Sequence, residues 1–426
     1  MATIRIGLFG LGNIGSGLYR LLSENGSLLR EREQADIDVA RVLVRDPGKA
    51  RQAAVPPERL TTRAEDILDD PDISIVVEMM GGAEPARTLI LEAIRRGKSV
   101  VTANKEVVAT HWDELQDAAR AHGVGFHFEA SVAGGIPIIR AIRQSLQGNR
   151  IERVMGIING TTNFILTRMS DAQEEFGDAL AQAQRMGYAE PDPTADIEGH
   201  DARFKLAILA SLCFGRTVRV QDIHCEGITR ISADDIACGR QLGFAVKLLA
   251  IARQTEQGIE ARVHPAFLPL THPLAAVRDA NNAIFIHGNA VGDLMFYGRG
   301  AGDLPTASAL VSDVLVCARE AGCHGAACPL PLPGAGRGAV QDDWLCSYYA
   351  HLTVDDHPGV LAAIAGIFGR HGVSLESVLQ QGRSGGVAPL VFVTHPAGER
   401  AIRSAMDEIA AQAVVQRVDN LIRVER

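Results

Sequence analysis

The sequence predicts an α/β protein in which a parallel sheet comes first, a mixed α+β region follows and a small βαββαβ unit ends the chain. Three observations support this prediction. Short apolar strands alternate with helical segments in the first third, an apolar helix follows an acidic loop in the middle, and a Pro/Gly-rich segment precedes the last unit. Because 426 residues exceed what one compact core holds, we expect three domains.

Composition places the chain among soluble globular proteins with a small-molecule substrate. Hydrophobic residues make up 46% and charged residues 22%. The net charge of -9 and the lack of a long Lys/Arg run argue against nucleic acid or an anionic membrane as a partner. No apolar run reaches the roughly 18 residues of a membrane span, and seven cysteines form no CxxC pair. We therefore expect a cytoplasmic enzyme with reduced thiols.

The first strand, at residues 4–9, runs into a glycine-rich turn and then into a helix. This order lets backbone N–H groups approach a pyrophosphate at the helix N-terminus. Further strands are expected at residues 38–44, 73–78, 99–102 and 124–128, with helices between them. The pattern predicts a Rossmann-type dinucleotide-binding domain. The expected cofactor-binding residues of the turn are Gly10, Gly12, Asn13, Ile14 and Gly15.

The second strand decides which dinucleotide is preferred. It ends in Val44, Arg45 and Asp46, so a basic residue comes before the acidic one. A base here neutralises a ribose 2′-phosphate, whereas an acid binds a 2′-hydroxyl. Arg45 therefore favours NADP without excluding NAD. The alternative is that Arg45 is only a solvated loop cation.

The fourth strand delivers Lys105 through the sequence TANK at its carboxyl end. Open parallel sheets bind ligands in the crevice beyond these ends, so Lys105 is expected to face the cofactor cleft. The alternative is a surface lysine that opens the next helix. A cation at the positive end of a helix dipole is unfavourable, which favours a functional role.

The acidic stretch at residues 187–205 carries five carboxylates and ends in an apolar helix. Asp201 and Lys205 stand one helical turn apart beside the apolar positions of that helix. An acid and an amine at the edge of a core suit proton transfer, but an ordinary helical ion pair explains the spacing equally well.

Two further turns are candidate ligand sites. Asn159 to Asn163 place four hydrogen-bonding side chains around Gly160, which exceeds what a helix cap requires and favours a ligand-facing turn. The segment 129–137 joins Glu129 to a turn of small residues, which is either an oxygen cage for a monovalent cation or a hinge. From its residues alone, the hinge is favoured.

Several long motifs in one order make the chain resemble homoserine dehydrogenase. They are GLGNIG at 10–15, TANK at 102–105, EASVAGGIP at 129–137, GIINGTTNFI at 156–165, GYAEPDPTADIEGHDARFK at 187–205 and YGRGAGDLPTA at 297–307. The resemblance covers nearly the whole chain. It implies NAD(P)-dependent interconversion of L-homoserine and L-aspartate 4-semialdehyde, on the route to threonine, methionine and isoleucine.

The resemblance also assigns roles to the candidate residues. It makes Lys205 the acid and base, Asp201 its orienting partner and Lys105 a second lysine at the substrate. It implies that Glu190 binds the substrate ammonium and that Asp196 supports this site. It further implies that Asn159, Gly160 and Thr161 form the substrate turn and that the glycine loop with Gly302 approaches the cofactor. The resemblance also implies a sodium-type cation site at Glu129 and the carbonyls of Val132, Gly134 and Ile136, in place of the hinge.

The C-terminal part predicts a separate module after a Pro/Gly-rich linker. Strands are expected at 348–354, 373–380, 390–394 and 421–424, and helices at 360–369 and 398–411. The segment DDHPGVLAAIAGIFGRHGVSLESV resembles an ACT domain, which implies an amino-acid effector such as threonine and a homodimer or homotetramer. The expected division is 1–134 for the nucleotide domain, completed by about 297–325, then 135–296 for catalysis and dimerisation, 326–347 for the linker and 348–426 for the ACT domain.

Two alternatives remain at this point. Another amino-acid dehydrogenase with an ACT domain would lack the combination of TANK, the 159–163 turn and the acidic loop. A catalytically idle amino-acid or redox sensor would not need Asp201, Lys205, Lys105 and Glu190 together, and all four are present.

Overall fold

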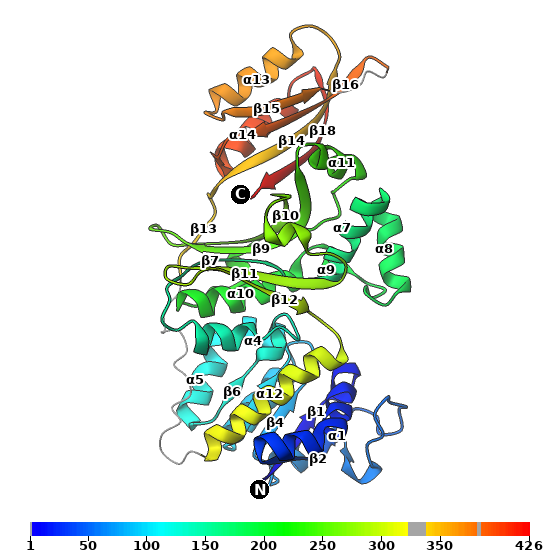
Figure 1. Cartoon of the computed structure of the whole chain (residues 1–426), viewed down its shortest axis with the longest axis vertical. Coiled ribbons are helices and arrows are strands. Elements are labelled where there is room, and N and C mark those ends of the chain that lie inside the picture. Colours follow the sequence, from blue (N-terminus) through cyan, green and yellow to red (C-terminus); the bar gives the residue numbers. More distant parts are fainter. Residues whose placement is uncertain (1, 323–337, 381–384) are drawn as a thin grey trace.

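The computed structural model describes residues 2–322, 338–380 and 385–426. The chain forms an elongated molecule with the nucleotide domain at one end, the C-terminal module at the other and a sheet region between them (Figure 1). Of the predicted linker 326–347, residues 326–337 lie outside the described part of the chain. No helix in the described part of the chain is long and apolar enough to cross a membrane.

The first sheet is a parallel sheet of six strands in the order β3-β2-β1-β4-β5-β6. The order turns back between β1 and β4, which is the switch point where doubly wound sheets bind ligands. The α/β fold class with a Rossmann-type sheet is confirmed. Only β3 was not predicted. It has two residues, as β6 has, but it lacks the flanking apolar residues, Val124 and Phe128, that mark β6 in the sequence. The strands are β1 (Ala2–Phe9), β2 (Ala35–Leu43), β3 (Leu60–Thr61), β4 (Ile75–Glu78), β5 (Ser99–Thr102) and β6 (Phe126–His127).

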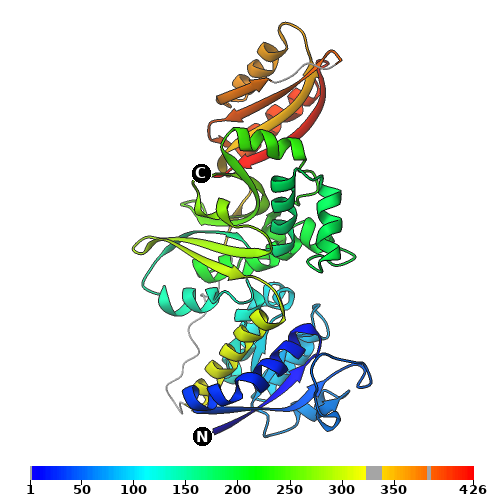
Figure 2. The same cartoon turned by 45° about the vertical axis from the view of Figure 1, so that its right-hand side comes forward.

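Helices cover both faces of this sheet. On one face α12 lies beside α1, although the two are far apart in the sequence (Figures 1 and 2). Leu18 and Leu22 of α1 share a buried cluster with Leu310 and Val314 of α12. The helices of this part are α1 (Asn13–Glu33), α2 (Glu65–Leu68), α3 (Ala86–Arg95), α4 (Lys105–Thr110), α5 (Trp112–His122), α6 (Ile138–Arg140) and α12 (Asp303–Gly322).

The middle region is built on antiparallel strands in the order β12-β11-β7-β9-β10. Helix α10 packs on this sheet and is buried along almost its whole length. Strand β9 was not predicted, because FAVKLLAIA is apolar at successive positions rather than at alternate ones. The elements are β7 (Ile151–Ile157), α7 (Gly160–Ala172), α8 (Phe176–Arg185), α9 (Thr194–Ile197), α10 (His200–Phe214), β8 (His224–Cys225), α11 (Ala233–Gln241), β9 (Phe244–Gln254), β10 (Ile259–Pro269), β11 (Asn281–Gly288) and β12 (Gly292–Arg299).

The C-terminal module has the predicted βαββαβ order, with its main strands arranged β18-β14-β16-β15. Strand β18 also pairs in parallel with β10, with Ala266 opposite Arg423, so one twelve-stranded sheet runs through both regions. The elements are β13 (Val340–Gln341), β14 (Leu345–Asp355), α13 (Val360–Arg370), β15 (Leu375–Gln380), β16 (Val387–Thr394), β17 (Ala397–Gly398), α14 (Glu399–Ala410) and β18 (Val415–Val424).

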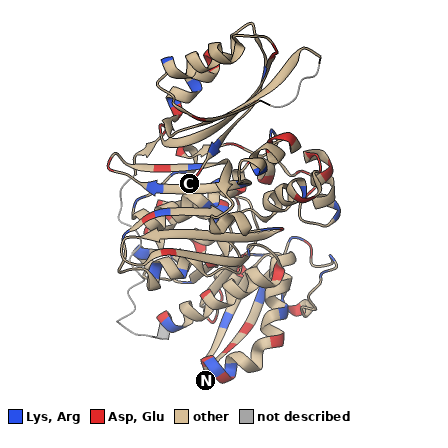
Figure 3. Ribbon diagram, turned by 45° about the horizontal axis from the view of Figure 1, so that its top comes forward, with Lys and Arg blue, Asp and Glu red and all other residues tan. Residues whose placement is uncertain are grey.

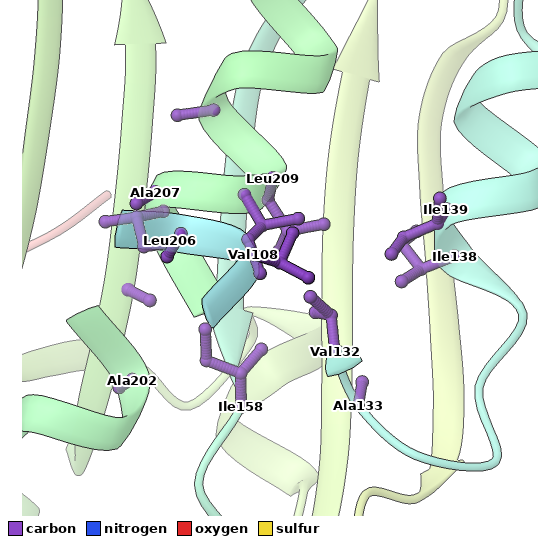
Figure 4. Packing of buried hydrophobic residues seen from close by; sticks show 14 of the residues in the cluster. Val108, Val132, Ala133, Ile138, Ile139, Ile158, Ala202, Leu206, Ala207 and Leu209 are labelled. Carbon is purple, nitrogen blue, oxygen red and sulfur yellow. The ribbon is translucent and has the colours of Figure 1, made fainter. Parts of the chain in front are cut away.

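A shared apolar core fixes the nucleotide domain against the middle region. Figure 4 shows Val108 of α4 beside Leu206 and Leu209 of α10, with Ile158 below them, and all four belong to one buried cluster. Because helices α4 and α10 pack here, the polar residues at their N-terminal ends are brought together. Charges of both signs are interspersed over the helices in Figure 3.

Candidate active site

Lys105 is held at the carboxyl end of β5 by a hydrogen-bonded turn. Asn104 caps α4, since its side-chain oxygen accepts from the Val107 N–H at 3.2 Å. The Thr102 hydroxyl donates to the buried carboxylate of Glu78 at 2.5 Å. Lys105 follows as the first helical residue, and its Nζ lies 3.0 Å from Asp201 Oδ1. The sequence analysis used the TANK motif only to place Lys105. The same motif also contains Asn104, the residue that caps α4.

Asp201 bridges the two lysines of the site. Lys205 Nζ donates to Asp201 Oδ2 at 2.7 Å and to the Ile158 carbonyl at 2.9 Å, while Lys105 takes the other carboxylate oxygen. Asp201 and Lys205 are both buried. Burial by itself raises the pKa of Asp201, but the two ammonium groups outweigh it and hold that pKa well below its usual value. Asp201 in turn raises the pKa of Lys105.

Asn159 is a clamp for two carboxylates. Its side-chain NH₂ donates to Asp196 at 2.7 Å and to Asp201 at 2.8 Å. Its side-chain oxygen accepts from the Thr162 N–H at 2.8 Å and so caps α7. Both amide hydrogens are therefore used within the protein, and Asn159 acts on the site by orienting Asp201.

The neighbouring residues of the 159–163 turn tie the acidic loop down. The Thr161 hydroxyl donates to the Tyr188 carbonyl at 2.6 Å. Gly160 leaves no room for a side chain, because a Cβ there would lie 2.7 Å from the Ala280 oxygen. Asp196 stands beside Asp201. Burial raises the pKa of Asp196, and the negative charge of Asp201 raises it further.

Within the described residues, no hydrogen bond or ion pair joins the Glu190 side chain to Lys105 or Lys205. The side chain of Glu190 is exposed, and its backbone carbonyl accepts from Gln184 at 3.1 Å. The two other acids of the loop have local partners. Asp192 accepts from the Thr194 N–H and hydroxyl, and Glu198 accepts from Thr229. The structure thus brings five of the predicted residues together: Lys105, Asn159, Asp196, Asp201 and Lys205.

The glycine turn has the geometry that a dinucleotide site requires. Gly10 has a φ of +102°, and a Cβ on Gly15 would lie 2.7 Å from the Gly10 carbonyl oxygen. A Cβ on Gly12 would point into open space at the start of α1, where Asn13 and Ile14 begin the helix. The fit to a pyrophosphate at this helix end is therefore good.

Arg45 and Gly302, which were also predicted to bind the cofactor, come from two other segments. Arg45 is exposed just beyond β2. Gly302 precedes α12, and the next residue, Asp303, pairs with Arg20 of α1 at 2.8 Å.

Glu129 occupies a second buried centre. Its two carboxylate oxygens accept the N–H groups of Ile139 and Arg140, each at 2.8 Å. Its own N–H donates to Asp313 at 2.8 Å, and Arg140 pairs with Asp313 at 2.9 Å. Burial and the nearby Asp313 raise the pKa of Glu129 to about 7. Asp313 had no sequence signal, because 184 residues separate it from Glu129.

The predicted cation ligands lie on the same short turn. Val132, Gly134 and Ile136 are all buried, and the Ile136 carbonyl accepts from the Ile138 N–H at 2.8 Å. One carboxylate with several carbonyls is a donor set that suits a hard cation, and each oxygen retains a second lone pair. No group of three or more His, Cys, Asp or Glu side chains able to hold a metal ion occurs among the residues that the structure describes.

The fold and this site define a class of protein. A Rossmann-type sheet for a nicotinamide dinucleotide meets a lysine-carboxylate cluster suited to proton transfer, which is the arrangement of an NAD(P)-dependent oxidoreductase acting on a CH–OH group.

Comparison with known proteins names the family. The family model for homoserine dehydrogenase matches residues 137–315, its NAD-binding domain matches 10–129, and an ACT domain matches 352–414. Homoserine dehydrogenase of Synechocystis is 46% identical and that of Corynebacterium glutamicum 44%, over 99% and 100% of this chain and 99% and 96% of theirs. A solved homoserine dehydrogenase from Thiobacillus denitrificans is 40% identical with a TM-score of 0.93, covering 100% of this chain and 99% of that one. The chain belongs to the homoserine dehydrogenase family.

Proposed function

We propose that this member of the family interconverts L-aspartate 4-semialdehyde and L-homoserine with Lys205 as the proton donor and acceptor. The single observation that supports this role most strongly is the buried Asp201 bridge, which joins Lys205 to Lys105 where the parallel sheet ends. When bound, the nicotinamide cofactor supplies or accepts the hydride. The residues of the chain then have to bind the substrate, orient it and move one proton.

Lys205 has one N–H for the substrate oxygen. Two of its three ammonium hydrogens go to Asp201 and to the Ile158 carbonyl. The third donates to the carbonyl oxygen of the semialdehyde, and its proton passes to that oxygen as the alcohol forms. The neutral amine takes the proton back in the oxidation of homoserine. Lys105 shares Asp201 and stabilises the oxygen on which charge develops.

Asp196 and Glu190 are proposed to bind the substrate's α-ammonium group. Asp196 is partly buried and fixed by Asn159, so it provides the positioned charge. Glu190 is exposed and provides a second carboxylate from the loop. In this scheme Gly160 and Thr161 shape the substrate turn.

NADP is proposed as the preferred cofactor because Arg45 stands exposed where β2 ends. An archaeal homoserine dehydrogenase, 26% identical with a TM-score of 0.66, was solved in complex with NADPH. The test compares KM for NADP and NAD in the wild type and in Arg45→Ala. We expect a rise of about tenfold in KM for NADP and little change for NAD, since one phosphate contact is lost. Equal changes for both would contradict the preference.

A sodium-type cation at Glu129 and the carbonyls of Val132, Gly134 and Ile136 is proposed as a stabiliser of the domain junction. The buried acidic centre supports it, since a cation would offset the repulsion between Glu129 and Asp313.

We further propose that the protein is a homodimer or homotetramer in the cytoplasm and acts in threonine, methionine and isoleucine biosynthesis. The C-terminal ACT domain supports an amino-acid effector such as threonine.

The direct test of the reaction follows reduced-cofactor absorbance with L-homoserine at alkaline pH, with NADP and with NAD. We expect turnover that requires both substrates. Absence of turnover with both cofactors would contradict the proposal. Repeating the assay over a range of L-threonine tests the effector, and an unchanged rate at every concentration would remove threonine from the account.

A further inference from the structure

Lys247 is a buried lysine to which the proposed reaction gives no role. It lies on β9 and is 5% exposed, and no carboxylate of the described residues lies within ion-pair distance of its ammonium group. Burial, and after it the guanidinium group of Arg278, lowers the pKa of Lys247 to about 8, although Asp171 and Asp279 oppose this effect. A buried amine without a carboxylate partner is costly, so its contacts need an explanation.

The hydrogen bonds of Lys247 and Asn163 form one network with the segment that leads into β11. Lys247 donates to the side-chain oxygen of Asn163 at 3.1 Å and to the Val277 carbonyl. The Asn163 NH₂ group donates to the carbonyls of Asp279 at 2.9 Å and Asn281 at 3.2 Å. The amide of Asn163 is therefore held at both ends, by a donor on its oxygen side and by acceptors on its nitrogen side.

This network does not depend on the charge of the amine. A charged amine has three N–H groups and a neutral amine has two. Lys247 uses two of them within the described residues, so both hydrogen bonds remain when the amine is neutral. Lys247 therefore serves here as a hydrogen-bond donor.

The same segment, residues 277–281, lies against the proposed substrate turn. A Cβ on Gly160 would lie 2.7 Å from the Ala280 oxygen, so the two backbones are in contact there. Asn163 closes the first turn of α7, since its N–H donates to the Asn159 carbonyl at 3.3 Å. A contact that fixes Asn163 and this segment therefore also fixes the backbone of Asn159.

Asn159 connects this network to the lysine cluster. Its side-chain NH₂ group donates to Asp196 at 2.7 Å and to Asp201 at 2.8 Å, and Asp201 accepts from Lys205 at 2.7 Å. Because a hydrogen bond weakens steeply when its angle is distorted, a shift of the turn would change how Asn159 holds the two carboxylates. An unbroken series of contacts thus joins Lys247 to the proposed proton donor.

We propose that Lys247 is a positioning residue for the proposed reaction, which holds Asn163 so that Asn159 keeps its two carboxylate partners in the productive geometry. The proposal rests on the function proposed above and adds to it a residue from outside the substrate turn. Lys247 acts through Asn163 and transfers no proton. Buried charged groups can often be replaced by apolar side chains of similar volume without loss of stability, so stability alone does not account for an amine at this position.

The first test compares Lys247→Met with Lys98→Met in the full-length protein. Lys98 is also 5% exposed and also donates two hydrogen bonds, to the carbonyls of Asp70 and Ile73 in the nucleotide domain. We expect Lys247→Met to lower kcat/KM for L-homoserine about tenfold, because a positioning hydrogen bond is lost, and to leave the affinity for NADPH unchanged. The fluorescence of NADPH measures that affinity without turnover. Lys98→Met should change neither quantity.

Equal losses of kcat/KM in the two variants would overturn the proposal, because the loss would then follow from burial alone. A wild-type kcat/KM in Lys247→Met would also overturn it. If Lys247→Met does not fold, Lys247→Gln, a shorter side chain that keeps an N–H donor, takes its place in this test and the next.

The second test is a double-mutant cycle with Asn159→Ala. In the Lys98→Met background, Asn159→Ala should lower kcat/KM about tenfold, as in the wild type, because the two sites are independent. In the Lys247→Met background the further loss should be about threefold or less, because the turn that carries Asn159 is already displaced. A lysine that only stabilised the fold would give the same tenfold loss in both backgrounds, and that result would overturn the proposal.

The outcomes separate the role of Lys247 from the proposed reaction. Turnover of L-homoserine by the wild type together with additive effects in the cycle would overturn the positioning role and leave the reaction standing. Absence of wild-type turnover with both cofactors would contradict the reaction and the positioning role with it.

Discussion

Two buried carboxylates near the junction of the nucleotide and middle regions differ in their partners, and the partners set their charge. Asp201 lies between the ammonium groups of Lys105 and Lys205, so its pKa is held well below the usual value. Burial and the nearby Asp313 raise the pKa of Glu129 to about 7, although the two backbone N–H groups that its carboxylate accepts lower it. Burial alone therefore does not predict whether a carboxylate is charged. Its charge depends on whether a cationic side chain lies beside it.

The largest expected effect comes from removing a cation of the Asp201 centre. Lys205→Met should lower turnover about a hundredfold to ten-thousandfold, because it removes the proton donor, while cofactor affinity stays unchanged. Steady-state kinetics and a cofactor titration measure the two quantities. Lys98→Met is the matched control, since Lys98 is also buried but donates to the carbonyls of Asp70 and Ile73. Nearly normal turnover in Lys205→Met would reduce the Asp201 pair to an ordinary ion pair.

A smaller effect is expected from loosening the same centre without changing its charge. Asn159→Ala removes both hydrogen bonds that orient Asp196 and Asp201 and should lower kcat/KM about tenfold. It also removes the cap of α7, at about 1 kcal/mol of stability. Ser232→Ala removes the cap of α11 and serves as the control. If both variants lose equal stability and neither loses turnover, Asn159 is only a cap.

The smallest effect concerns the Glu129 centre and depends on pH. The folded-state pKa of Glu129, about 7, lies above the usual 4.5, so the folded chain holds this proton more tightly than the unfolded chain. Without a bound cation, the contribution of Glu129 to the free energy of unfolding therefore falls as the pH rises from about 4.5 to about 7. Above about pH 7 it falls no further.

Sodium should reverse this loss at pH 8 and have little effect at pH 5.5. We expect Tm in sodium chloride to exceed Tm in tetramethylammonium chloride by about 2 °C or more at pH 8. Glu129→Gln should abolish the difference. Identical Tm values in the two salts at pH 8 would speak against a cation at this centre.

Much of the fold follows from patterns within short segments. The glycine turn, five of the six parallel strands and the βαββαβ order were predicted, since each depends on local periodicity and turn residues. Strand β9 was missed, because a strand buried on both faces loses its alternation. The pairing of β18 with β10 was also unforeseen, because no local pattern records which strand edges meet.

The active site was predictable to the extent that its residues are neighbours in sequence. Asp201 and Lys205 are one helical turn apart, so spacing alone joined them. Lys105 and Asn159 reach the same carboxylate across long separations, and only the family resemblance placed Lys105 there. The double role of Asn159, which caps α7 and binds two carboxylates, was not predictable. The turn offers four polar side chains, and the sequence does not show which of them takes which role.

The pH profile of Asp201→Asn tests the central claim most directly, namely that Asp201 holds Lys105 in its charged form by raising its pKa. The variant keeps the shape of the side chain but removes the charge that raises the pKa of Lys105. Because Lys105 then loses its charge at a lower pH, the alkaline limb of the kcat/KM profile for homoserine oxidation should move to lower pH, along with a loss of rate. Asp235→Asn removes another buried carboxylate, the partner of His351, and should leave the profile in place. An unshifted profile in Asp201→Asn would contradict the account.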